Sequence, residues 1–467
     1  MKAYQLLIDG QLVPGEQTME VLNPATEQLL AVCPRASQAQ ADAAVEAAHR
    51  AFQNWRLVPI VERRALIMKL ADAIKDDAES LAQSLTLEQG KPITEARAEI
   101  AYTEYWLRVL GALEMAPKLI EDSDGRRVEM HRSPLGVVAA IIPWNFPVLV
   151  VAFKLPLALL AGNTLVIKPA PTTPLTTLLL GALCSRIFPP GVVNVITDAN
   201  DLGQVLTSHP LVAKVSLTGS TETGKKVMAS AAGTLKRLTL ELGGNDAAIV
   251  LDDADPKKVA AGIFGSAFLC CGQLCLAIKR VYAHEKIYNE LCAELGRLAD
   301  AAIVGNGQDE RTQFGPLQNR AQYAKFQEFL ADAKSNGRIV AGGTLPEGPG
   351  YFVRPTIVAD IQDGSKLVDE EQFSPILPII KFSDTERALA SANGLSFGLG
   401  ASVWSSSTQR AVELALRMEA GTRWVNKHAD FGPTIPFCGA KQSGIGVEFA
   451  EEGLAEFTQI QVLNVAK

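Results

Sequence analysis

The sequence has little of three things: uninterrupted apolar runs, cysteine and net charge. In its 467 residues the longest apolar stretches, 148–153 and 155–162, are interrupted by Lys154 and Pro156. They fall short of the roughly 20 residues that cross a membrane. The N-terminus precedes no apolar run of the kind that marks a secretory signal. We therefore expect no membrane partner and a cytoplasmic location.

The charge and the cysteines exclude further classes of protein. A formal net charge of −7 argues against a nucleic-acid partner. The seven cysteines are odd in number and scattered, which does not describe a disulfide framework. Cys270, Cys271 and Cys275 lack the spacing and the nearby histidine of a zinc site, so we expect no metal.

Two long segments alternate between buried strands and helices, an order typical of parallel sheets covered on both faces. In the first we expect strands at 136–143, 164–168, 192–196 and 214–218, and helices at 152–161, 175–187, 202–206 and from about 222. In the second, from 247 to about 444, we expect strands at 247–251, 280–284, 376–382 and 400–404, and helices at 256–268 and 286–302. Helices are also expected at 41–52, 61–74 and 94–110. The pattern predicts two α/β domains with a cleft between them, and ligands in such folds bind beyond the carboxyl ends of the strands.

Two further segments favour an oligomer. Asp124-Gly125 is a hairpin signal within residues 117–134, and residues 457–463 resemble an apolar edge strand. An edge strand of this kind invites aggregation unless it is covered. We therefore expect an arm that pairs subunits, in a homodimer or a dimer of dimers.

A phosphate-binding turn is suggested by residues 219–226, which follow a strand and open a helix. They nearly match the GxxxxGK[ST] loop, but Lys226 occupies the position of the Mg²⁺-binding hydroxyl, which disfavours nucleotide hydrolysis. The segment is not the dinucleotide GxGxxG either. It remains either a helix N-terminus suited to a phosphate or pyrophosphate, or an ordinary turn and N-cap.

Two polar side chains follow buried strands. Lys168 ends one strand, where ligands usually bind, although a solvated lysine is an equal alternative. Asn145 lies between two prolines and two aromatic residues, which would hold its amide where it could donate to a developing oxyanion. A local turn is the alternative for an isolated asparagine.

The pair Glu241 and Cys275 carries the most chemistry. A thiolate attacks a carbonyl carbon, and a nearby carboxylate can activate the water that later releases the acyl group. A buried, inert cysteine beside a surface glutamate is the common alternative.

Seven strings together resemble, in order and in wording, the NAD(P)-dependent aldehyde dehydrogenase superfamily. They are residues 142–147 (IPWNFP), 168–169 (KP), 218–221 (TGST), 241–244 (ELGG), 272–275 (GQLC), 371–375 (EQFSP) and 436–439 (PFCG). The resemblance covers essentially the whole chain. It implies two doubly wound α/β domains plus a small β oligomerisation arm. The implied divisions are an NAD(P)-binding domain at 1–116 and 135–242, a catalytic domain at 243–445, and the arm and C-terminal segment at 117–134 and 446–467.

The resemblance also assigns roles. Cys275 is similar to the family's nucleophile, Glu241 to its general base, and Asn145 with the Cys275 backbone N–H to its oxyanion hole. The positions similar to cofactor-binding ones are Ile142, Pro143, Trp144, Lys168, Gly219, Ser220, Leu242, Glu371 and Phe373. Many NAD-preferring members carry a glutamate three residues after the strand-end lysine, and here that residue is Pro171. This glutamate, which discriminates against NADP, is thus absent; NAD is preferred, with NADP possible.

The substrate class can be inferred only from the residues at positions similar to the family's aldehyde entrance. Apolar residues stand where the family has its aldehyde entrance: Phe146, Val150, Phe153, Leu274, Leu276, Phe431 and Phe437. They favour an apolar aliphatic or aromatic aldehyde, oxidised to the carboxylic acid through a cysteine thiohemiacetal and thioester. Each alone could equally be core packing.

Three alternatives stay open. A semialdehyde dehydrogenase would act on an aldehyde with a second polar group, and His428 could add polarity to the funnel. A cysteine acyltransferase or hydrolase without redox chemistry would need a base such as histidine beside the thiol, yet none of the five histidines lies in the matched strings. A scaffold without enzymatic activity would be marked by loss of Cys275, Glu241 or Asn145, and all three are present.

Overall fold

The computed structural model describes residues 4–467, and its first sheet is parallel in the middle and antiparallel at both edges. The strand order is β2-β1-β9-β8-β7-β10-β11-β21. The bounds are β1 Leu6–Ile8, β2 Gln11–Val13, β7 Val137–Ile141, β8 Thr164–Lys168, β9 Val193–Val195, β10 Val212–Thr218, β11 Arg237–Glu241 and β21 Gly444–Ile445. Every residue of β7 and β8 is buried, as expected of strands covered on both faces.

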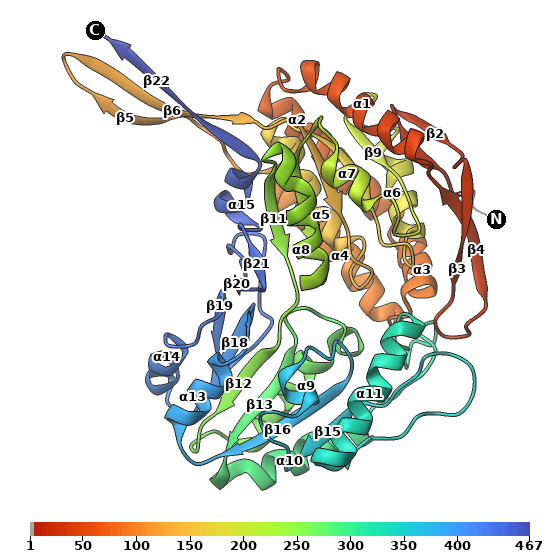
Figure 1. Cartoon of the computed structure of the whole chain (residues 1–467), viewed down its shortest axis with the longest axis vertical. Helices are drawn as coiled ribbons and strands as arrows, with labels where there is room; N and C mark the ends of the chain where they lie inside the picture. The colour runs from red at the N-terminus through yellow and green to blue at the C-terminus, as the bar shows by residue number, and fades with distance from the viewer. Residues whose placement is uncertain (1–3) are drawn as a thin grey trace.

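Helices from the first half of the chain surround this sheet (Figure 1). They are α1 Gln38–Trp55, α2 Ile60–Asp76, α3 Ala78–Gln89, α4 Ile93–Gly111, α5 Leu149–Ala161, α6 Leu175–Cys184, α7 Gly203–Ser208 and α8 Thr221–Ala231. The helices and central strands expected from the sequence are present, with ends shifted by a few residues. The antiparallel edges were not expected, because β1, β2 and β21 are two or three residues long and show no alternating pattern.

The second sheet has the order β14-β15-β16-β13-β12-β18-β19 and is parallel except at β14. Its strands are β12 Asp246–Val250, β13 Ile278–His284, β14 Arg338–Ala341, β15 Thr356–Ala359, β16 Ile376–Phe382, β18 Gly400–Trp404 and β19 Thr422–Val425. Its helices are α9 Pro256–Phe268, α10 Glu285–Asp300, α11 Arg320–Asn336, α12 Lys366–Asp369, α13 Thr385–Asn393 and α14 Thr408–Ala415. Each sheet has its own buried apolar cluster, which supports two α/β units. The exact domain divisions expected from the sequence stay a prediction.

A three-stranded arm projects from the first unit and carries the C-terminus near its tip (Figure 1). It consists of β5 Lys118–Asp122, β6 Arg126–Pro134 and β22 Thr458–Ala466, in the order β22-β6-β5. The Asp-Gly hairpin is therefore present and pairs with the apolar C-terminal strand. Exposed side chains on the arm include Leu119, Ile120 and Val462.

The remaining elements are short or peripheral. They are β3 Gln17–Leu22, β4 Leu29–Arg35, β17 Phe397–Gly398, β20 Ala440–Lys441 and α15 Ala450–Glu456. Within residues 4–467 no helix is long and apolar enough to cross a membrane.

The chain passes between the two units directly after β11, and β21 returns to pair with β11 in antiparallel orientation (Figure 1). The carboxyl end of the first sheet therefore faces the second unit. The loops that meet there carry most of the residues singled out in the sequence.

Candidate active site

The loop before β13, which carries Cys275, has an unusual backbone conformation at residues 270–272. Cys270 and Cys271 have φ of 51° and 57°, and Gly272 has φ of 71°. Left-handed conformations in non-glycine residues cost energy and concentrate at functional sites. A Cβ at position 272 would lie 2.7 Å from the backbone of Ser374, so glycine lets this loop approach the one that carries Glu371. Cys275 itself is partly exposed, while residues on both sides of it are buried.

Glu241, the last residue of β11, lies close enough to the Cys275 thiol for each group to shift the pKa of the other. Burial raises the pKa of Glu241 to about 7, even though the Cys275 thiol and the Lys154 charge lower it. Burial, followed by the charge of Glu241, raises the pKa of Cys275 well above that of a free thiol. This arrangement puts the thiol beside a carboxylate that can act as a base near neutral pH.

A buried ion pair that sequence reasoning missed lies behind Glu241. Lys154 Nζ donates to Glu448 Oε1 at 2.7 Å and to Ser216 Oγ at 3.0 Å, and both charged side chains are almost fully buried. Lys154 lowers the pKa of Glu241, and Glu448 raises it. A single lysine within the otherwise apolar helix α5 was the sequence signal that could have pointed to this pair.

Asn145 lies beside the cysteine loop. Its Nδ2 donates to the carbonyl of Gln273 at 2.9 Å, which leaves its second N–H available. Its own carbonyl accepts from Lys91 Nζ at 2.9 Å, and Lys91 is also ion-paired with Glu99. Glu99 in turn accepts from the first amides of α5. The backbone at Asn145 is therefore held by the buried ion pair of Lys91 and Glu99, which come from α4 and the loop before it.

The turn after β10 forms the start of α8. The Ser220 side chain caps this helix by accepting from the Thr223 amide at 3.2 Å, and the Gly219 amide donates to the Glu241 carbonyl at 3.0 Å. The alternative of an ordinary N-cap is thus realised for Ser220. An N-cap does not exclude a ligand, because other amides of the first turn stay unpaired within the helix.

Glu371 and Phe373 enter the site from the second unit. Glu371 Oε1 accepts from the Gly244 amide at 3.1 Å, and a Cβ at position 243 would lie 2.3 Å from its other oxygen. Burial raises the pKa of Glu371. The ring of Phe373 packs edge-on against that of Trp144, with 5.4 Å between the ring centres.

Lys168 ends β8 but is buried rather than solvated. Its Nζ donates to Asp198 Oδ1 at 2.7 Å, and Asp198 is fully buried beyond the end of β9. The sequence analysis did not single out Asp198. Ile142 and Leu242 are also buried, and their amides donate to the carbonyls of Lys168 and Ser443.

A cavity of about 260 Å³ joins these groups. Among the predicted residues that line it are the three catalytic candidates, all seven candidates for substrate contact, and the cofactor candidates Pro143, Trp144, Gly219, Ser220, Glu371 and Phe373. The buried Ile142, Lys168 and Leu242 do not line it. Lining residues that the sequence analysis missed include Tyr102, Leu149, Lys325, Glu448 and Phe449.

Aromatic rings surround the end of this cavity away from Glu371. Phe153 lies 4.6 Å from both Trp106 and Phe449, measured between ring centres. Phe431 lies 6.4 Å from Phe153 and 6.3 Å from Phe437. These edge-on and tilted arrangements form a wall that an apolar group can contact on several sides.

Comparison with known proteins identifies the family of this chain. The model of the Aldehyde dehydrogenase family matches residues 12–463.

The chain belongs to the aldehyde dehydrogenase family. It is an NAD(P)-dependent oxidoreductase, as the resemblance implied.

Two relatives and one solved structure illustrate the similarity. A phenylacetaldehyde dehydrogenase of Pseudomonas fluorescens is 36% identical, over 99% of this chain and 96% of its own. The succinate-semialdehyde dehydrogenase (NADP(+)) GabD of Escherichia coli (strain K12) is 35% identical, over 99% and 97%. The NAD+ complex structure of aldehyde dehydrogenase from Bacillus cereus has a TM-score of 0.97 at 36% identity, covering 100% of this chain and 97% of that one.

The donor set of this aldehyde dehydrogenase fits a nicotinamide dinucleotide. The N-terminus of α8 offers backbone amides for a pyrophosphate, and Glu371 offers a carboxylate for ribose hydroxyls at the cysteine end of the cavity. Trp144 and Phe373 add apolar faces to the same groove.

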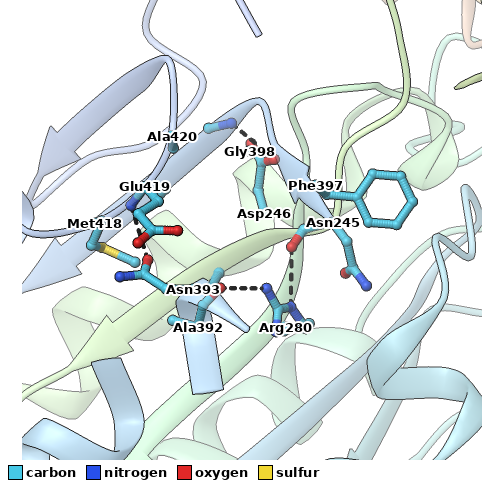
Figure 2. A pocket seen from close by; sticks show the side chains of 13 residues that line it. Asn245, Asp246, Arg280, Ala392, Asn393, Phe397, Gly398, Met418, Glu419 and Ala420 are labelled. Carbon is cyan, nitrogen blue, oxygen red and sulfur yellow. Dashed lines mark hydrogen bonds between the residues drawn. The ribbon is translucent and has the colours of Figure 1, made fainter. Parts of the chain in front are cut away.

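A second, small polar cavity is lined by residues of β12, β13 and β18 and by the loops beside them (Figure 2). Arg280 donates to the carbonyls of Asn245 and Ala392, each at 3.0 Å. Asp246 accepts from the Gly400 amide at 3.0 Å, and its other oxygen lies 3.4 Å from His428 Nε2. His428 Nε2 also lies 3.1 Å from the Leu276 carbonyl, so the ring packs against the cysteine loop, and it does not line the main cavity.

Proposed function

We propose that this aldehyde dehydrogenase oxidises an apolar aldehyde, aromatic or aliphatic, to its carboxylic acid. Cys275 is the nucleophile, Glu241 the general base and Asn145 an oxyanion donor. The observation that carries the proposal is that these three side chains line one mostly apolar cavity, with Glu241 in contact with the thiol.

In the first half of the reaction, the Cys275 sulfur forms a bond to the aldehyde carbon. Glu241 takes the thiol proton, because the two groups lie together in the cavity wall and the pKa of Glu241 is about 7. The free N–H of Asn145 and the backbone N–H of Cys275 donate to the oxygen that becomes negative. Bound NAD(P) supplies the acceptor for the hydride that leaves the same carbon, and a thioester on Cys275 remains.

In the second half, Glu241, which has by then released the thiol proton to solvent, removes a proton from water. The resulting hydroxide attacks the thioester carbon and the C–S bond breaks. The acid leaves as product, and the Cys275 thiolate takes back the proton held by Glu241. The raised pKa of Glu241 supports this role, because a base near neutral pH can both accept and release a proton in each cycle. A cysteine hydrolase without redox chemistry is disfavoured, because the groove beside the thiol carries the donor set of a dinucleotide.

The lining of the cavity supports the apolar substrate class. Of the described lining residues, Lys325 is the only lysine or arginine. Its Nζ donates to the Glu371 carbonyl at 2.6 Å, on the cofactor side. A semialdehyde with a carboxylate would therefore meet aromatic rings where it needs a cation. The similarity to a phenylacetaldehyde dehydrogenase is consistent with an aromatic substrate, while the similarity to GabD keeps semialdehydes in the test.

The preferred cofactor under this proposal is NAD. By the family resemblance, Lys168 would bind the adenosine ribose hydroxyls; Asp198 Oδ1 lies 2.7 Å from its Nζ and offsets its charge. A 2′-phosphate would meet a neutral pair rather than a free ammonium. The sequence did not decide between NAD and NADP, because Pro171 replaces the discriminating glutamate. The pairing of Lys168 with Asp198 supports NAD.

The arm bears on the oligomeric state of the protein, and the free cysteines bear on its cellular compartment. The exposed apolar side chains of β5 and β22 support pairing of subunits through the arm, as a homodimer or a dimer of dimers. All seven thiols are free, which suits a reducing cytoplasmic compartment.

Reduced-nicotinamide absorbance tests the function directly. The protein is mixed with NAD or NADP and with phenylacetaldehyde, hexanal, acetaldehyde or succinate semialdehyde. We expect the highest kcat/KM with NAD and either phenylacetaldehyde or hexanal. A clear preference for succinate semialdehyde would overturn the substrate class, and silence with every aldehyde and both cofactors would overturn the assignment as an active oxidoreductase.

A further inference from the structure

A buried lysine four positions after the nucleophile supports the backbone of the cysteine loop. Lys279 Nζ donates to the carbonyl of Leu274 at 2.8 Å and to that of Cys275 at 2.6 Å. Its side chain is 2% exposed, so these bonds form away from solvent, where a charge-assisted hydrogen bond is strong. Lys279 therefore holds the two carbonyls on either side of the nucleophile's own amide nitrogen and Cα.

The same ammonium group also faces the residues expected to hold the cofactor. It lies 3.8 Å from Glu371 Oε1 and 5.8 Å from the centre of the Phe373 ring. Glu371 is otherwise fixed by the Gly244 amide, and Gln372 donates to the Lys279 carbonyl at 3.0 Å. Lys279 is thus in contact with both loops that build the reacting end of the cavity.

The strand keeps this side chain in place. Successive residues of a strand point to opposite faces, so Lys279 points to the reactive loop while its neighbour Arg280 points into the small polar cavity (Figure 2). Arg280 is bonded there to the carbonyls of Asn245 and Ala392. Rotation of β13 about its axis would break these bonds, so the orientation of Lys279 is fixed from the opposite face.

The charges around the sulfur give Lys279 a second effect. Burial raises the pKa of Cys275 most, Glu241 on β11 and Asp246 on β12 raise it further, and the charge of Lys279 on β13 lowers it. Without Lys279, the thiol would face two carboxylates with no opposing charge among these groups.

We propose that Lys279 is a positioning residue that fixes the nucleophile loop against the Glu371 loop and favours the thiolate of Cys275. The proposal rests on the proposed role of Cys275. A single cation in contact with both loops means that removing its charge changes two properties together: the reactivity of the thiol and the affinity for NAD.

The experiment compares Lys279→Gln, Lys279→Met and Lys279→Arg with Lys214→Met as a control. Lys214 is another fully buried lysine of a parallel strand, but it donates to Thr239 and has no contact with Cys275. Two quantities are measured on the full-length protein without substrate. The first is the rate of alkylation of Cys275 by iodoacetamide as a function of pH, followed by peptide mass, and the second is the Kd for NAD by calorimetry.

For Lys279→Gln and Lys279→Met we expect alkylation at neutral pH to slow about tenfold, with the pH midpoint moved upward by about one unit. The Kd for NAD should rise about tenfold in the same variants, because Glu371 loses its opposing charge. Lys279→Arg should restore most of the alkylation rate, since it restores the charge. Lys214→Met should leave the pH midpoint and the Kd near those of the wild type.

The glutamine variant separates charge from support, because it can still donate to a carbonyl. If Lys279→Gln is folded and alkylates with the wild-type pH midpoint, or if it binds NAD with the wild-type Kd, the inference is wrong. Cys275→Ser distinguishes this failure from failure of the proposed function. Turnover that survives Cys275→Ser overturns the nucleophile assignment itself, whatever the lysine variants do.

Discussion

The ammonium of Lys168 donates to Asp198 Oδ1 at 2.7 Å, and the pair lies buried beyond the carboxyl ends of β8 and β9. The other oxygen of Asp198 accepts from the Leu202 amide at 3.0 Å, just before α7. The carboxylate of Asp198 is therefore held by a backbone hydrogen bond, and its negative charge offsets the positive charge of Lys168. We propose that Asp198, which follows β9, contributes to the choice between NAD and NADP in place of the glutamate that Pro171 replaces.

Replacing Asp198 by asparagine should improve the binding of NADP relative to NAD. Asparagine keeps the shape and can still accept from the Leu202 amide, but it frees the charge of Lys168 for a 2′-phosphate. We expect the ratio of the Kd for NADP to that for NAD to fall about tenfold, the effect of about 1.4 kcal/mol. Calorimetric titration of both cofactors measures it.

The control restores a carboxylate at the position that lacks it. Pro171→Glu in the wild type should raise the same ratio, since a second carboxylate near the ribose repels the phosphate. An unchanged ratio in Asp198→Asn would show that Asp198 only buries a lysine.

Replacing Asn145 by alanine should slow chemistry far more than it weakens cofactor binding. One N–H of the side chain donates to the Gln273 carbonyl, and the other is free to donate to the oxyanion. Loss of one such donor costs about 10²–10³ in kcat. Single-turnover hydride transfer at saturating NAD measures the chemical step, and the Kd for NAD is the internal control. Turnover within a few-fold of the wild type would contradict the assignment.

Replacing Glu241 by glutamine should separate the two halves of the reaction. Glutamine cannot deprotonate water, so the thioester on Cys275 should accumulate and steady-state turnover should fall about 10²–10⁴-fold. Rapid mixing should still show one equivalent of reduced cofactor per active site, formed more slowly than in the wild type because Glu241 also takes the thiol proton. A variant that hydrolyses the thioester at the wild-type rate would exclude Glu241 as the base.

The pH dependence should report the same carboxylate. The base must be ionised, and burial raises its pKa to about 7. Deacylation should therefore be near its maximum above pH 7 and should fall about tenfold per pH unit below it. The steady-state rate from pH 5.5 to 8.5 measures this where deacylation limits turnover. A profile that is flat between pH 5.5 and 7 would place the pKa of the base much lower.

The sequence predicted the central strands and the contacts of the cavity better than the edges of the fold. Cys275, Glu241 and Asn145 could be found because each follows a buried element in a recognisable string. Asp198, Lys279 and the pair Lys154 and Glu448 were missed, because the carboxylate that pairs with each lysine lies far from it in the chain. From the sequence alone, a lysine in a strand or helix is expected to be solvated, and only the folded structure shows that a carboxylate lies against it. The short strands β1 and β21 were missed for a related reason, since only the neighbouring strand defines them.

The aromatic wall should decide the substrate, and Phe431 is the side chain that tests it best. Its ring is half-buried, lines the cavity and packs against Phe153 and Phe437, so shortening it changes the cavity wall. Phe431→Leu removes ring contacts but keeps an apolar side chain. We expect kcat/KM for phenylacetaldehyde to fall about tenfold, within the range of 1–3 kcal/mol that apolar pocket contacts contribute. The value for acetaldehyde should change less than threefold, because this substrate is too short to reach the ring. Phe264→Leu, at a half-buried ring of α9 in the other apolar cluster, controls for general loosening and should alter neither value. Equal losses for the two aldehydes in Phe431→Leu would mean that the ring supports the loop rather than the substrate.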